Sequence, residues 1–557
     1  MKNIFHKLVA TAAVATLFSC SDFLDQELQG NPDTNQYFNT QYQLQESLNA
    51  VYNILQTDKY TNSEWIFGEA CGDDVVSTDE ATTSQIAQVV NFTFNTSNDY
   101  ILRRYEIMYK GINRANQVIA NAHKVKFADA DNSNYQNVRQ ILGQAKFLRA
   151  MFYFNLVKTF GGVPIRPETE DVTALTIPRS TKEEVYAYIE KDLREAAIML
   201  PAVFTDGNAG KVGAGAATAL LMKVLVYQAT PGEPSDKWDE VVRLGKYFVG
   251  GQAMSYAEMI RLETYDETWD EIHDRLWFKP KALLGPKDTY ETAETQMPVL
   301  ANQYNLEAKS TYDNSTLHYR QLYHQAGEFC ARSVFEIVFK ESADGTTGDS
   351  NQGTGIVNDI FMNRVFASTS FRNAVAADPR RNEVILLHAS VTFDGERLEV
   401  PNGRYGCMKW YTPKSERPRE ASDNGKNRRV IIYSDVVLLY AEALNETGNR
   451  MEALEQLNSV KAVANKITNV ATLYKAGTYL EMRDQIWTER RLELCHLWDR
   501  YWDIVRQGRA ASILHALAAE TTHMRGKNFI EGINEVFPIP QNEIDITNGV
   551  VAQNPGY

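Results

Sequence analysis

Apolar residues recur at the spacing of an α-helix over most of the chain outside its middle third. In residues 43–56, for instance, one helical face carries Leu44, Leu48, Val51, Tyr52 and Leu55. The same period is found in residues 101–123, 138–160, 181–200, 215–229, 238–248, 434–446, 450–464 and 479–507. A period near 3.6 residues predicts amphipathic helices, each of which must bury its apolar face against another element.

Two pairs of these helices, 216–228 with 238–248 and 436–446 with 450–464, are joined by short turns. Small residues at the contacts, such as Ala443, and the turn at Gly448 resemble a tetratricopeptide hairpin. No regular period of about 34 residues runs through the chain, so ordinary helical hairpins are the alternative. Since hairpins recur early and late, we expect a mainly α fold, a superhelical scaffold of tetratricopeptide-like helix hairpins.

The middle of the chain, from about residue 250 to 429, has no sustained helical period. It is rich in Gly, Pro, Asn, Asp and aromatic residues, and short alternating runs at 334–339 and 383–387 predict strands. An irregular stretch of this length is usually functional or disordered, and its aromatic residues favour a function. We therefore expect a loop-rich, minor-β region here that binds a ligand.

These patterns favour one domain over residues 20–557. Its helical scaffold would occupy about 40–249 and 430–510, with the loop-rich insertion at about 250–429. A length of 557 residues would by itself suggest three or four domains. We prefer a single domain because the helical hairpins resume after the insertion.

The first residues carry the features of a secretory signal peptide. Lys2 and Lys7 precede or flank an apolar run of ten residues, which is too short to span a bilayer. The run leads to Cys20 in a stretch that resembles a bacterial lipobox, with Phe18 bulkier than usual. We expect residues 1–19 to be a lipoprotein signal peptide and Cys20 to be lipidated, so that acyl chains hold the protein on a membrane. An ordinary cleavage site with an incidental Cys is the alternative.

The charge balance argues against nucleic acid as a partner. The chain has 57 Lys and Arg against 71 Asp and Glu, a net charge of −14, and binding to phosphate backbones requires a basic surface. The other cysteines are far apart, without a CxxC pair or metal spacing: Cys71, Cys330, Cys407 and Cys495. They could form two disulfides, but we expect buried free thiols, and we predict no metal or cofactor.

Common enzyme signatures are absent, since the chain has no GxSxG, HExxH or P-loop motif. Acids cluster at Asp73-Asp74 and around Trp269, and a glycoside hydrolase would need two carboxylates across a sugar ring. Aromatic residues beside polar ones are the better clue, because sugars stack on flat rings while their hydroxyls bind polar groups. Such clusters are Tyr304, Tyr312, Tyr319, Tyr323 and His324, and Tyr405, Trp410 and Tyr411. Core packing is the commoner role of any single aromatic residue.

Several segments, in order along the chain, resemble the SusD/RagB family of Bacteroidetes outer-membrane nutrient-binding lipoproteins. They are CSDFLD at 20–25, FLRA at 147–150, GGVP at 161–164, DPR at 378–380, LLYAEAL at 438–444, ERR at 489–491, RQG at 506–508, PIP at 538–540 and QNPGY at 553–557. The resemblance runs almost from end to end. One departure is Leu497-Trp498, where many relatives carry an acidic residue and Gly.

The resemblance implies a surface-exposed outer-membrane lipoprotein that binds an oligosaccharide or, less often, a peptide without catalysis. It also implies delivery of that ligand to a SusC-type TonB-dependent barrel. The family motifs lie mostly in the scaffold, so we predict the ligand residues from their chemistry: Trp65, Asp73, Asp74, Trp277, Tyr304, Tyr323, Arg380, Tyr405 and Trp410. A surface glycoside hydrolase and a purely structural barrel subunit are the alternatives.

Overall fold

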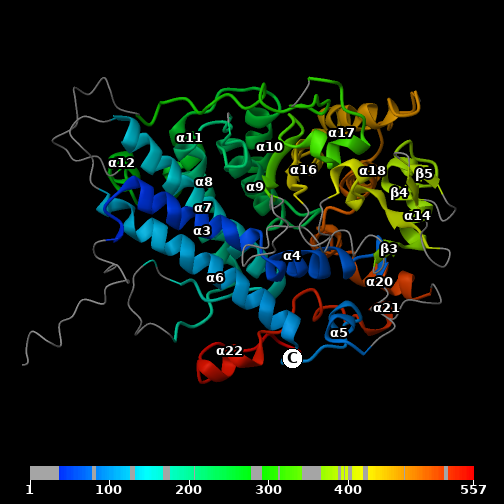
Figure 1. The fold of residues 1–557 in the computed structure, drawn as a ribbon, viewed down its shortest axis with the longest axis horizontal. Coiled ribbons are helices and arrows are strands. Elements are labelled where there is room, and N and C mark those ends of the chain that lie inside the picture. The colour runs from blue at the N-terminus through cyan, green and yellow to red at the C-terminus, as the bar shows by residue number, and fades with distance from the viewer. Residues whose placement is uncertain are drawn as a thin grey trace, which may run out of the picture.

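The computed structural model describes residues 37–77, 83–125, 132–166, 168, 176–205, 207–277, 292–311, 314–340, 365–386, 391–393, 396–398, 404–417, 425–469, 471–519 and 525–557. Most of these residues are helical, and the strands are few and short (Figure 1). The predicted signal peptide and Cys20 lie outside the described residues. None of the described helices is long and apolar enough to cross a membrane.

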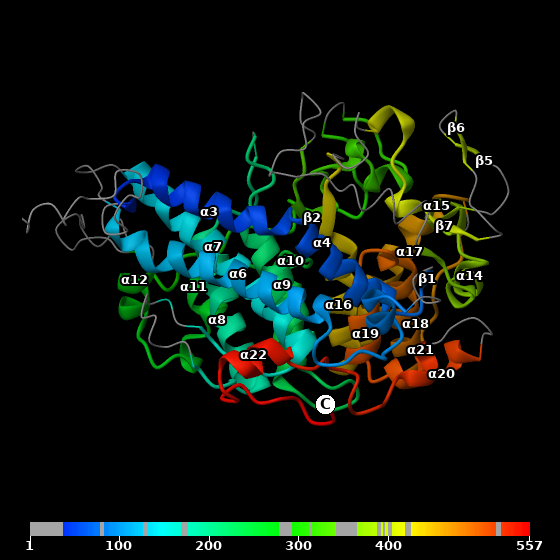
Figure 2. The ribbon, with the colours of Figure 1, turned by 60° about the horizontal axis from the view of Figure 1, so that its bottom comes forward.

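Helices form the first half of the scaffold. They are α3 (Gln41–Leu55), α4 (Asp58–Trp65), α5 (Gln85–Val90), α6 (Asp99–Asn121), α7 (Asn132–Phe160), α8 (Lys182–Met199), α9 (Ala214–Val226) and α10 (Asp236–Phe248). The helices α3, α6 and α7 pack against one another, and α7 also packs on α8 (Figure 2). Capping boxes begin α3 and α8, because the hydroxyls of Thr40 and Thr181 accept backbone N–H groups of the first turn.

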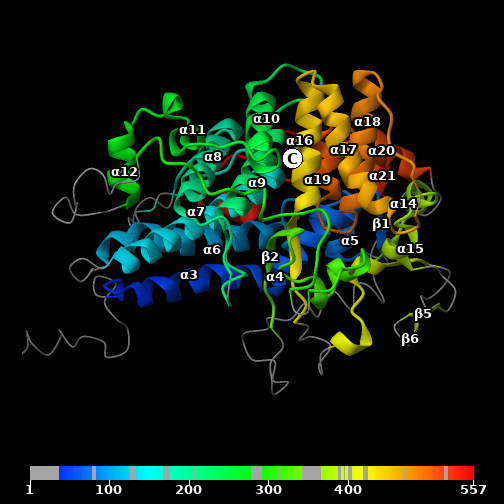
Figure 3. The same ribbon diagram turned by 90° about the horizontal axis from the view of Figure 1, so that it is seen from above.

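The helices after the middle region complete the scaffold. They are α16 (Tyr433–Glu446), α17 (Arg450–Asn465), α18 (Tyr479–Leu494), α19 (Arg500–Arg506), α20 (Ala510–Ala518), α21 (Arg525–Asn528) and α22 (Gln541–Ile546). Besides α17 and α18, α16 contacts α9 and α10 of the first half (Figure 3). A Cβ on Gly245 of α10 would lie 2.2 Å from the Tyr440 ring of α16, so this crossing depends on glycine. The predicted hairpins α9–α10 and α16–α17 are therefore confirmed, and they pack into one scaffold.

The single helix predicted over residues 479–507 is wrong, since the structure divides it into α18 and α19. His496 and Trp498 in the intervening turn have φ values of 60° and 68°, in the left-handed region. The turn places the Trp498 backbone N–H 3.1 Å from Glu69 Oε2, on the π-helix η1 (Ile66–Ala70). A contact between residues this far apart in the chain cannot be predicted from the spacing of apolar residues within one segment.

Short helices and strands make up the middle region. Its helices are α11 (Tyr256–Ile260), α12 (Trp269–Trp277), α14 (Thr369–Val375) and α15 (Arg381–Val384), and its strands are β2 (Ser333–Ile337), β3 (Val365–Ala367), β4 (Ile385–Leu386), β5 (Val391–Phe393), β6 (Glu396–Leu398) and β7 (Gly406–Cys407). The strand predicted at 334–339 is confirmed as β2. The strand predicted at 383–387 is reduced to β4, because its first residues belong to α15.

All strand pairs in the described residues are antiparallel, and two of them join the middle region to the scaffold. The strand β2 pairs with β8 (Arg428–Ile432), which leads directly into α16, and β3 pairs with β1 (Val75–Ser77). The remaining pairs, β4 with β7 and β5 with β6, lie within the middle region. The loops are therefore attached to both halves of the scaffold.

The apolar core has two parts. One large cluster runs through the scaffold, and a smaller cluster in the middle region includes Tyr319, Tyr323 and Phe371. The smaller cluster includes Leu492 of α18, so α18 packs against the loops of the middle region. The four cysteines of the described residues are buried free thiols, as predicted: Cys71, Cys330, Cys407 and Cys495.

Candidate functional site

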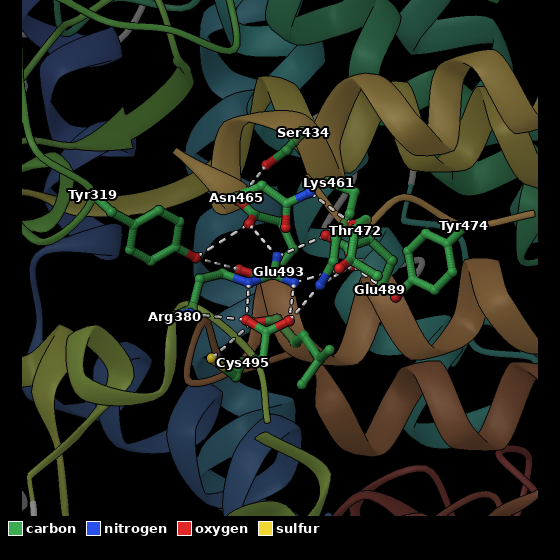
Figure 4. A network of polar contacts seen from close by, with 12 residues as sticks. Tyr319, Arg380, Ser434, Lys461, Asn465, Thr472, Tyr474, Glu489, Glu493 and Cys495 are labelled. Atoms are coloured by element: carbon green, nitrogen blue, oxygen red, sulfur yellow. Dashed lines mark hydrogen bonds and ion pairs between the residues drawn. The ribbon is translucent and has the colours of Figure 1, made fainter. Parts of the chain in front are cut away.

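A buried network of charges around Arg380 joins the middle region to α18 (Figure 4). The Arg380 guanidinium donates from Nη1 to Glu489 at 2.7 Å and to Glu493 at 2.8 Å, and from Nε to Asp378 at 2.8 Å. Lys461 of α17 pairs with Asp378 at 2.6 Å. Each buried charge here has a partner of opposite sign, which is the condition for burying charges without a large cost.

Glu493 is the acceptor at the other end of this network. It accepts hydrogen bonds from the Ser434 hydroxyl at 2.9 Å and the Tyr319 hydroxyl at 3.2 Å, and it pairs with Arg332. Burial by itself would raise the pKa of Glu493, but Arg332 and Arg380 outweigh burial and lower the pKa to about 2. Arg380 itself is fully buried, so this structure gives its guanidinium a supporting role, and its contact with a ligand stays a prediction.

Asp73 and Asp74 lie in the turn after η1 and are also buried. Asp73 pairs with Arg500 at 2.7 Å and with Arg491 at 2.8 Å, and Asp74 pairs with Arg491 at 2.7 Å. Burial opposes ionisation, yet these arginines hold the pKa of Asp73 well below its ordinary value. The two carboxylates therefore fasten the segment before β1 to α18 and α19.

Trp65 and Tyr304, two of the predicted stacking residues, lie in the core. Trp65 is the last residue of α4, and its Nε1 donates to Asn62 at 3.1 Å. The Tyr304 ring stacks on Phe248 and Tyr433, with centroid distances of 5.2 and 6.1 Å. Both side chains are buried, so a ligand could reach them only if neighbouring helices moved, and their contact with a ligand stays a prediction.

Tyr323 and Trp410 are brought together at a small buried chamber beneath the loops. The Trp410 Nε1 donates to the His496 carbonyl oxygen at 2.7 Å, and the Lys409 ammonium lies 4.5 Å from the centroid of the Tyr323 ring. Both rings are buried and face the chamber. They line one chamber, whose volume of about 50 Å³ is too small for a sugar ring.

Tyr405 is half-buried, and among the predicted ligand residues with described side chains it alone is partly exposed. The residue directly precedes β7, and the Arg372 guanidinium of α14 lies 4.2 Å from its ring centroid. Trp277 is the last residue of α12, and its side chain is not among those that the structure describes. The helices α12 and α14 are at opposite ends of the molecule, so the predicted residues do not form a single site (Figures 1 and 3).

A cavity of about 610 Å³, here called the loop cavity, opens in the middle region. Its walls are η8 (Arg320–Tyr323), η9 (Gln325–Gly327), α15, η13 (Lys414–Glu416) and the residues after α17. Its polar and aromatic lining consists of His318, Tyr319, Arg320, Gln321, His324, Glu383, Ser415, Glu416 and Lys466. Small-molecule sites commonly have volumes of about 300–1,000 Å³, so the loop cavity is of the right size for a ligand.

His324 gives the loop cavity a polar group that the protein leaves unused. The side chain is 5% exposed, and its Nε2 has no hydrogen-bond partner among the described residues. Burial, with the cations Lys426, Arg320 and Arg429 nearby, lowers the pKa of His324 to about 3, so the imidazole is neutral at physiological pH. A buried polar atom without a partner is costly, and a hydroxyl of a ligand would remove that cost.

The charged groups of the loop cavity have partners in the protein. Arg320 lies 3.1 Å from Glu383, and Glu416 accepts the Gln325 backbone N–H at 3.0 Å. Guanidinium groups donate and carboxylates accept hydrogen bonds, so both kinds of group can bind hydroxyls. This combination of rings, imidazoles and paired charges suits a neutral, hydroxyl-rich ligand.

Only some of the residues that line the loop cavity were singled out from the sequence. Tyr319 and His324 fall in the predicted aromatic cluster, whereas His318, Arg320 and Glu416 were not singled out. The useful signal was the presence of two histidines on either side of the tyrosines at 319 and 323. Glu416 lies almost a hundred positions further on, and only the fold brings it to the same cavity.

Two of the acids around Trp269 are engaged by neighbouring residues. Glu267 binds Arg275 at 2.9 Å, and Glu271 accepts the Thr268 backbone N–H at 2.8 Å, as a cap of α12. These carboxylates have local structural partners. Within the described part of the chain, no three His, Cys, Asp or Glu side chains are grouped as a metal site requires.

Two family models match this chain. One, described as "Starch-binding associating with outer membrane", matches residues 22–226, and the other, described as the SusD family, matches residues 376–557. Among named relatives, SusD-like protein P38 of Formosa agariphila is 24% identical over 92% of this chain and 93% of the relative.

Solved structures share the fold. A laminarin binding SusD-like protein has a TM-score of 0.68 and 23% identity, over 93% of this chain and 100% of that chain. Surface glycan-binding protein A from Bacteroides thetaiotaomicron, in complex with laminarihexaose, has a TM-score of 0.66 and 20% identity, over 92% of this chain and 99% of that chain. The two family models together cover more than half of the chain, in the order that its motifs predicted. The chain belongs to the SusD/RagB family.

Proposed function

We propose that this protein captures an oligosaccharide in the loop cavity and passes it, chemically unchanged, to a SusC-type TonB-dependent barrel. The observation that carries the proposal is the 610 Å³ cavity with a neutral imidazole in its wall, whose Nε2 has no hydrogen-bond partner among the described residues. The starch-binding description of one matching family model and the laminarin and laminarihexaose named for two similar structures support a glycan as the ligand.

The lining residues have distinct roles in this proposal. His324 Nε2 binds a hydroxyl inside the cavity, because it has no hydrogen-bond partner among the described residues. Glu416 lines the same cavity, and its carboxylate can accept a hydrogen bond from a hydroxyl. His318 is exposed at the wall and can contact a sugar as it enters. Tyr405 adds a partly exposed ring on the segment before β7, where a longer glycan could stack a C–H face.

Isothermal titration calorimetry with a panel of oligosaccharides and a panel of peptides tests the ligand class. We expect binding to at least one glycan, weakened about fivefold or more by His318→Ala, since one hydrogen bond is worth about 1 kcal/mol. The matched control is His123→Ala, which removes an exposed histidine from the scaffold. Binding to peptides and to no glycan would overturn the glycan assignment and establish the peptide alternative.

A hydrolytic activity would distinguish the enzyme alternative. Chromatography of glycans incubated with the purified protein should show intact ligand, because Glu267 and Glu271, at the start of α12, have structural partners. Turnover that disappears with Glu267→Gln would instead identify a glycoside hydrolase. Turnover that persists in that variant would point to a contaminating enzyme.

The lipid anchor and the barrel partner are separate parts of the proposal, supported by the sequence around Cys20 and by family membership. Cys20→Ala should move the protein from the membrane fraction to the soluble fraction and abolish labelling with radioactive palmitate. Copurification of a TonB-dependent barrel with the wild-type protein tests the partner. If Cys20→Ala stayed in the membrane fraction and was still labelled, Cys20 would not be the anchor.

A further inference from the structure

The small chamber beneath the loops, here called the cation chamber, has a volume of about 50 Å³. It lies where β8 and the short helix η12 (Met408–Trp410) meet the turn between α18 and α19. Its lining consists of Tyr323, Lys409, Trp410, Lys426, Asn427, Arg428, Arg429, His496, Leu497 and Trp498. A water molecule takes about 30 Å³ of liquid, so the cation chamber holds roughly one or two groups of that size.

Three side chains of the cation chamber have polar atoms without a hydrogen-bond partner among the described residues. They are Arg428, at Nη1, Trp498, at Nε1, and His496, at both ring nitrogens. All three are nine-tenths or more buried, with exposed fractions of 10% for the Arg428 side chain, 5% for Trp498 and 1% for His496. The Arg428 guanidinium stacks over the Trp498 indole, 4.1 Å from the ring centroid, so the two donors are neighbours.

These atoms share one chemistry. The Arg428 Nη1 and the Trp498 Nε1 can only donate, and a neutral imidazole always carries one N–H. Unpaired buried donors in native proteins are uncommon and call for a specific explanation. Three of them around one small space favour an acceptor without protons of its own.

The charges around the cation chamber agree with a negative occupant. Four cations line it, and the ion pairs of Arg428 with Glu64 and of Arg429 with Glu336, both at 3.5 Å, balance this charge only in part. Lys409 donates to the Glu493 carbonyl oxygen, which is a neutral acceptor. Glu69, which accepts the Trp498 backbone N–H, has its pKa raised well above the ordinary value, chiefly by burial.

Lys426 is the fourth cation, and its ammonium donates to the carbonyl oxygens of Trp410 and Tyr411 at 3.1 and 3.0 Å. Burial, with Arg429 nearby, lowers the pKa of Lys426 to about 7. An anion in the cation chamber would oppose the effects of burial and of Arg429 on this pKa and keep the Lys426 ammonium charged.

We propose that the cation chamber is a binding site for one small inorganic anion of chloride size, held by Arg428 Nη1, Trp498 Nε1 and a ring N–H of His496. The chamber is too small for a sugar ring. The anion neutralises the cations that join β8 to the α18–α19 turn. Arg429, which lines the chamber, donates to the His324 carbonyl oxygen at 2.7 Å, so the anion also supports one wall of the loop cavity.

Bromide is a suitable probe, because it resembles chloride and is seen directly by anomalous scattering. Crystals of the full chain, purified in detergent and grown in sodium bromide, should show a bromine peak among Arg428, Trp498 and His496. In solution, bromide should raise the Tm in a saturable way relative to sodium gluconate at equal ionic strength, since gluconate is too large to enter.

Trp498→Phe removes one donor and keeps an aromatic ring, and it should raise the half-saturating bromide concentration about tenfold or more. The matched control is Trp238→Phe on α10, because Trp238 Nε1 is likewise buried without a partner and the residue does not line the chamber. Arg428→Gln should abolish the response. The crystallographic measurement on the wild-type protein does not depend on whether these variants fold.

The proposal is overturned if the crystals show ordered water and no bromine peak in the cation chamber. An equal bromide response in wild type, Trp498→Phe and Trp238→Phe would also overturn it, because the response would then be a general salt effect. Neither result bears on glycan binding in the loop cavity, which calorimetry in sodium gluconate tests separately.

Discussion

Asp73 and Arg500 are 427 positions apart in the chain, yet their side chains form a buried ion pair at 2.7 Å. The pair ties the turn before β1 to the first residue of α19. Arg491 of α18 binds both Asp73 and the adjacent Asp74, so the beginning of the scaffold is locked onto its last third. The loops of the middle region are thus held between two segments that are themselves fixed by charge.

Loss of Arg500 should therefore destabilise the whole fold. Arg500→Met leaves Asp73 buried with Arg491 as its remaining close cation, and breaking a buried pair costs about 3–5 kcal/mol. Urea unfolding followed by circular dichroism measures this change. Arg381→Met, at an exposed position of α15, is the matched control and should cost less than about 0.5 kcal/mol. A loss below about 1 kcal/mol for Arg500→Met would show that the pair is dispensable.

The stability of the fold should decrease as the pH is lowered, in a window set by the pKa of Glu493. Its pKa is lowered from an ordinary value of 4.5 to about 2, so the folded state releases this proton more readily than the unfolded state. A depressed carboxylate pKa stabilises the fold above the unfolded pKa, and that stability is lost as pH falls from about 4.5 toward 2.

Glu493→Gln should reduce the slope of unfolding free energy against pH in this window by up to about 1.4 kcal/mol per pH unit, the value for one proton. Urea titrations at several pH values measure the slope, whatever the overall stability of the variant. The control is Glu106→Gln at an exposed position of α6, which should leave the slope unchanged. An identical slope in Glu493→Gln would mean that other carboxylates govern the acid transition.

A third prediction concerns the crossing of α10 and α16. Alanine is a better helix former than glycine by about 1 kcal/mol, so Gly245→Ala would stabilise an isolated helix. In this fold the added Cβ would lie 2.2 Å from the Tyr440 ring, and overpacking of this kind costs about 1–3 kcal/mol. We expect a lower Tm by differential scanning calorimetry. Tyr440→Ala should remove the clash, so Gly245→Ala should be neutral or stabilising in that background. A higher Tm for Gly245→Ala in the presence of Tyr440 would contradict the packing argument.

The helical hairpins could be predicted from the sequence because their signals are local. The apolar stripes of α9, α10, α16 and α17 repeat every three or four residues, and Gly448, with φ of 84°, marks a tight turn. The break between α18 and α19 could not be predicted in this way, because it serves a contact of Trp498 with Glu69.

The site was harder to predict, for the same physical reason. Asp74 and Arg380 are polar residues in irregular segments, which is the pattern of a surface site, and only the fold shows that ion pairs bury them. The loop cavity is assembled from His318, Glu383 and Glu416, whose proximity depends on the pairing of β4 with β7 and on the end of α17. Chemistry pointed to aromatic and polar residues of the middle region, where the loop cavity lies, whereas only the fold shows which of these side chains are buried.

The last prediction separates stacking from hydrogen bonding in glycan capture. Tyr405→Ala removes the partly exposed ring next to Arg372, and loss of one stacking contact worth about 1 kcal/mol should weaken binding of a long oligosaccharide about fivefold. A short oligosaccharide held inside the loop cavity should be affected much less, because Tyr405 does not line that cavity.

Glu416→Gln should give the opposite pattern and weaken short and long oligosaccharides alike, since Glu416 lines the cavity itself. Calorimetric titrations of both variants with oligosaccharides of increasing length give the comparison. Tyr42→Ala is the control for Tyr405→Ala, because Tyr42 on α3 is 73% exposed and is not part of the loop cavity. If Tyr405→Ala weakened all lengths equally, the ring would act on the cavity through the loops and would not be a stacking platform for the outer sugars.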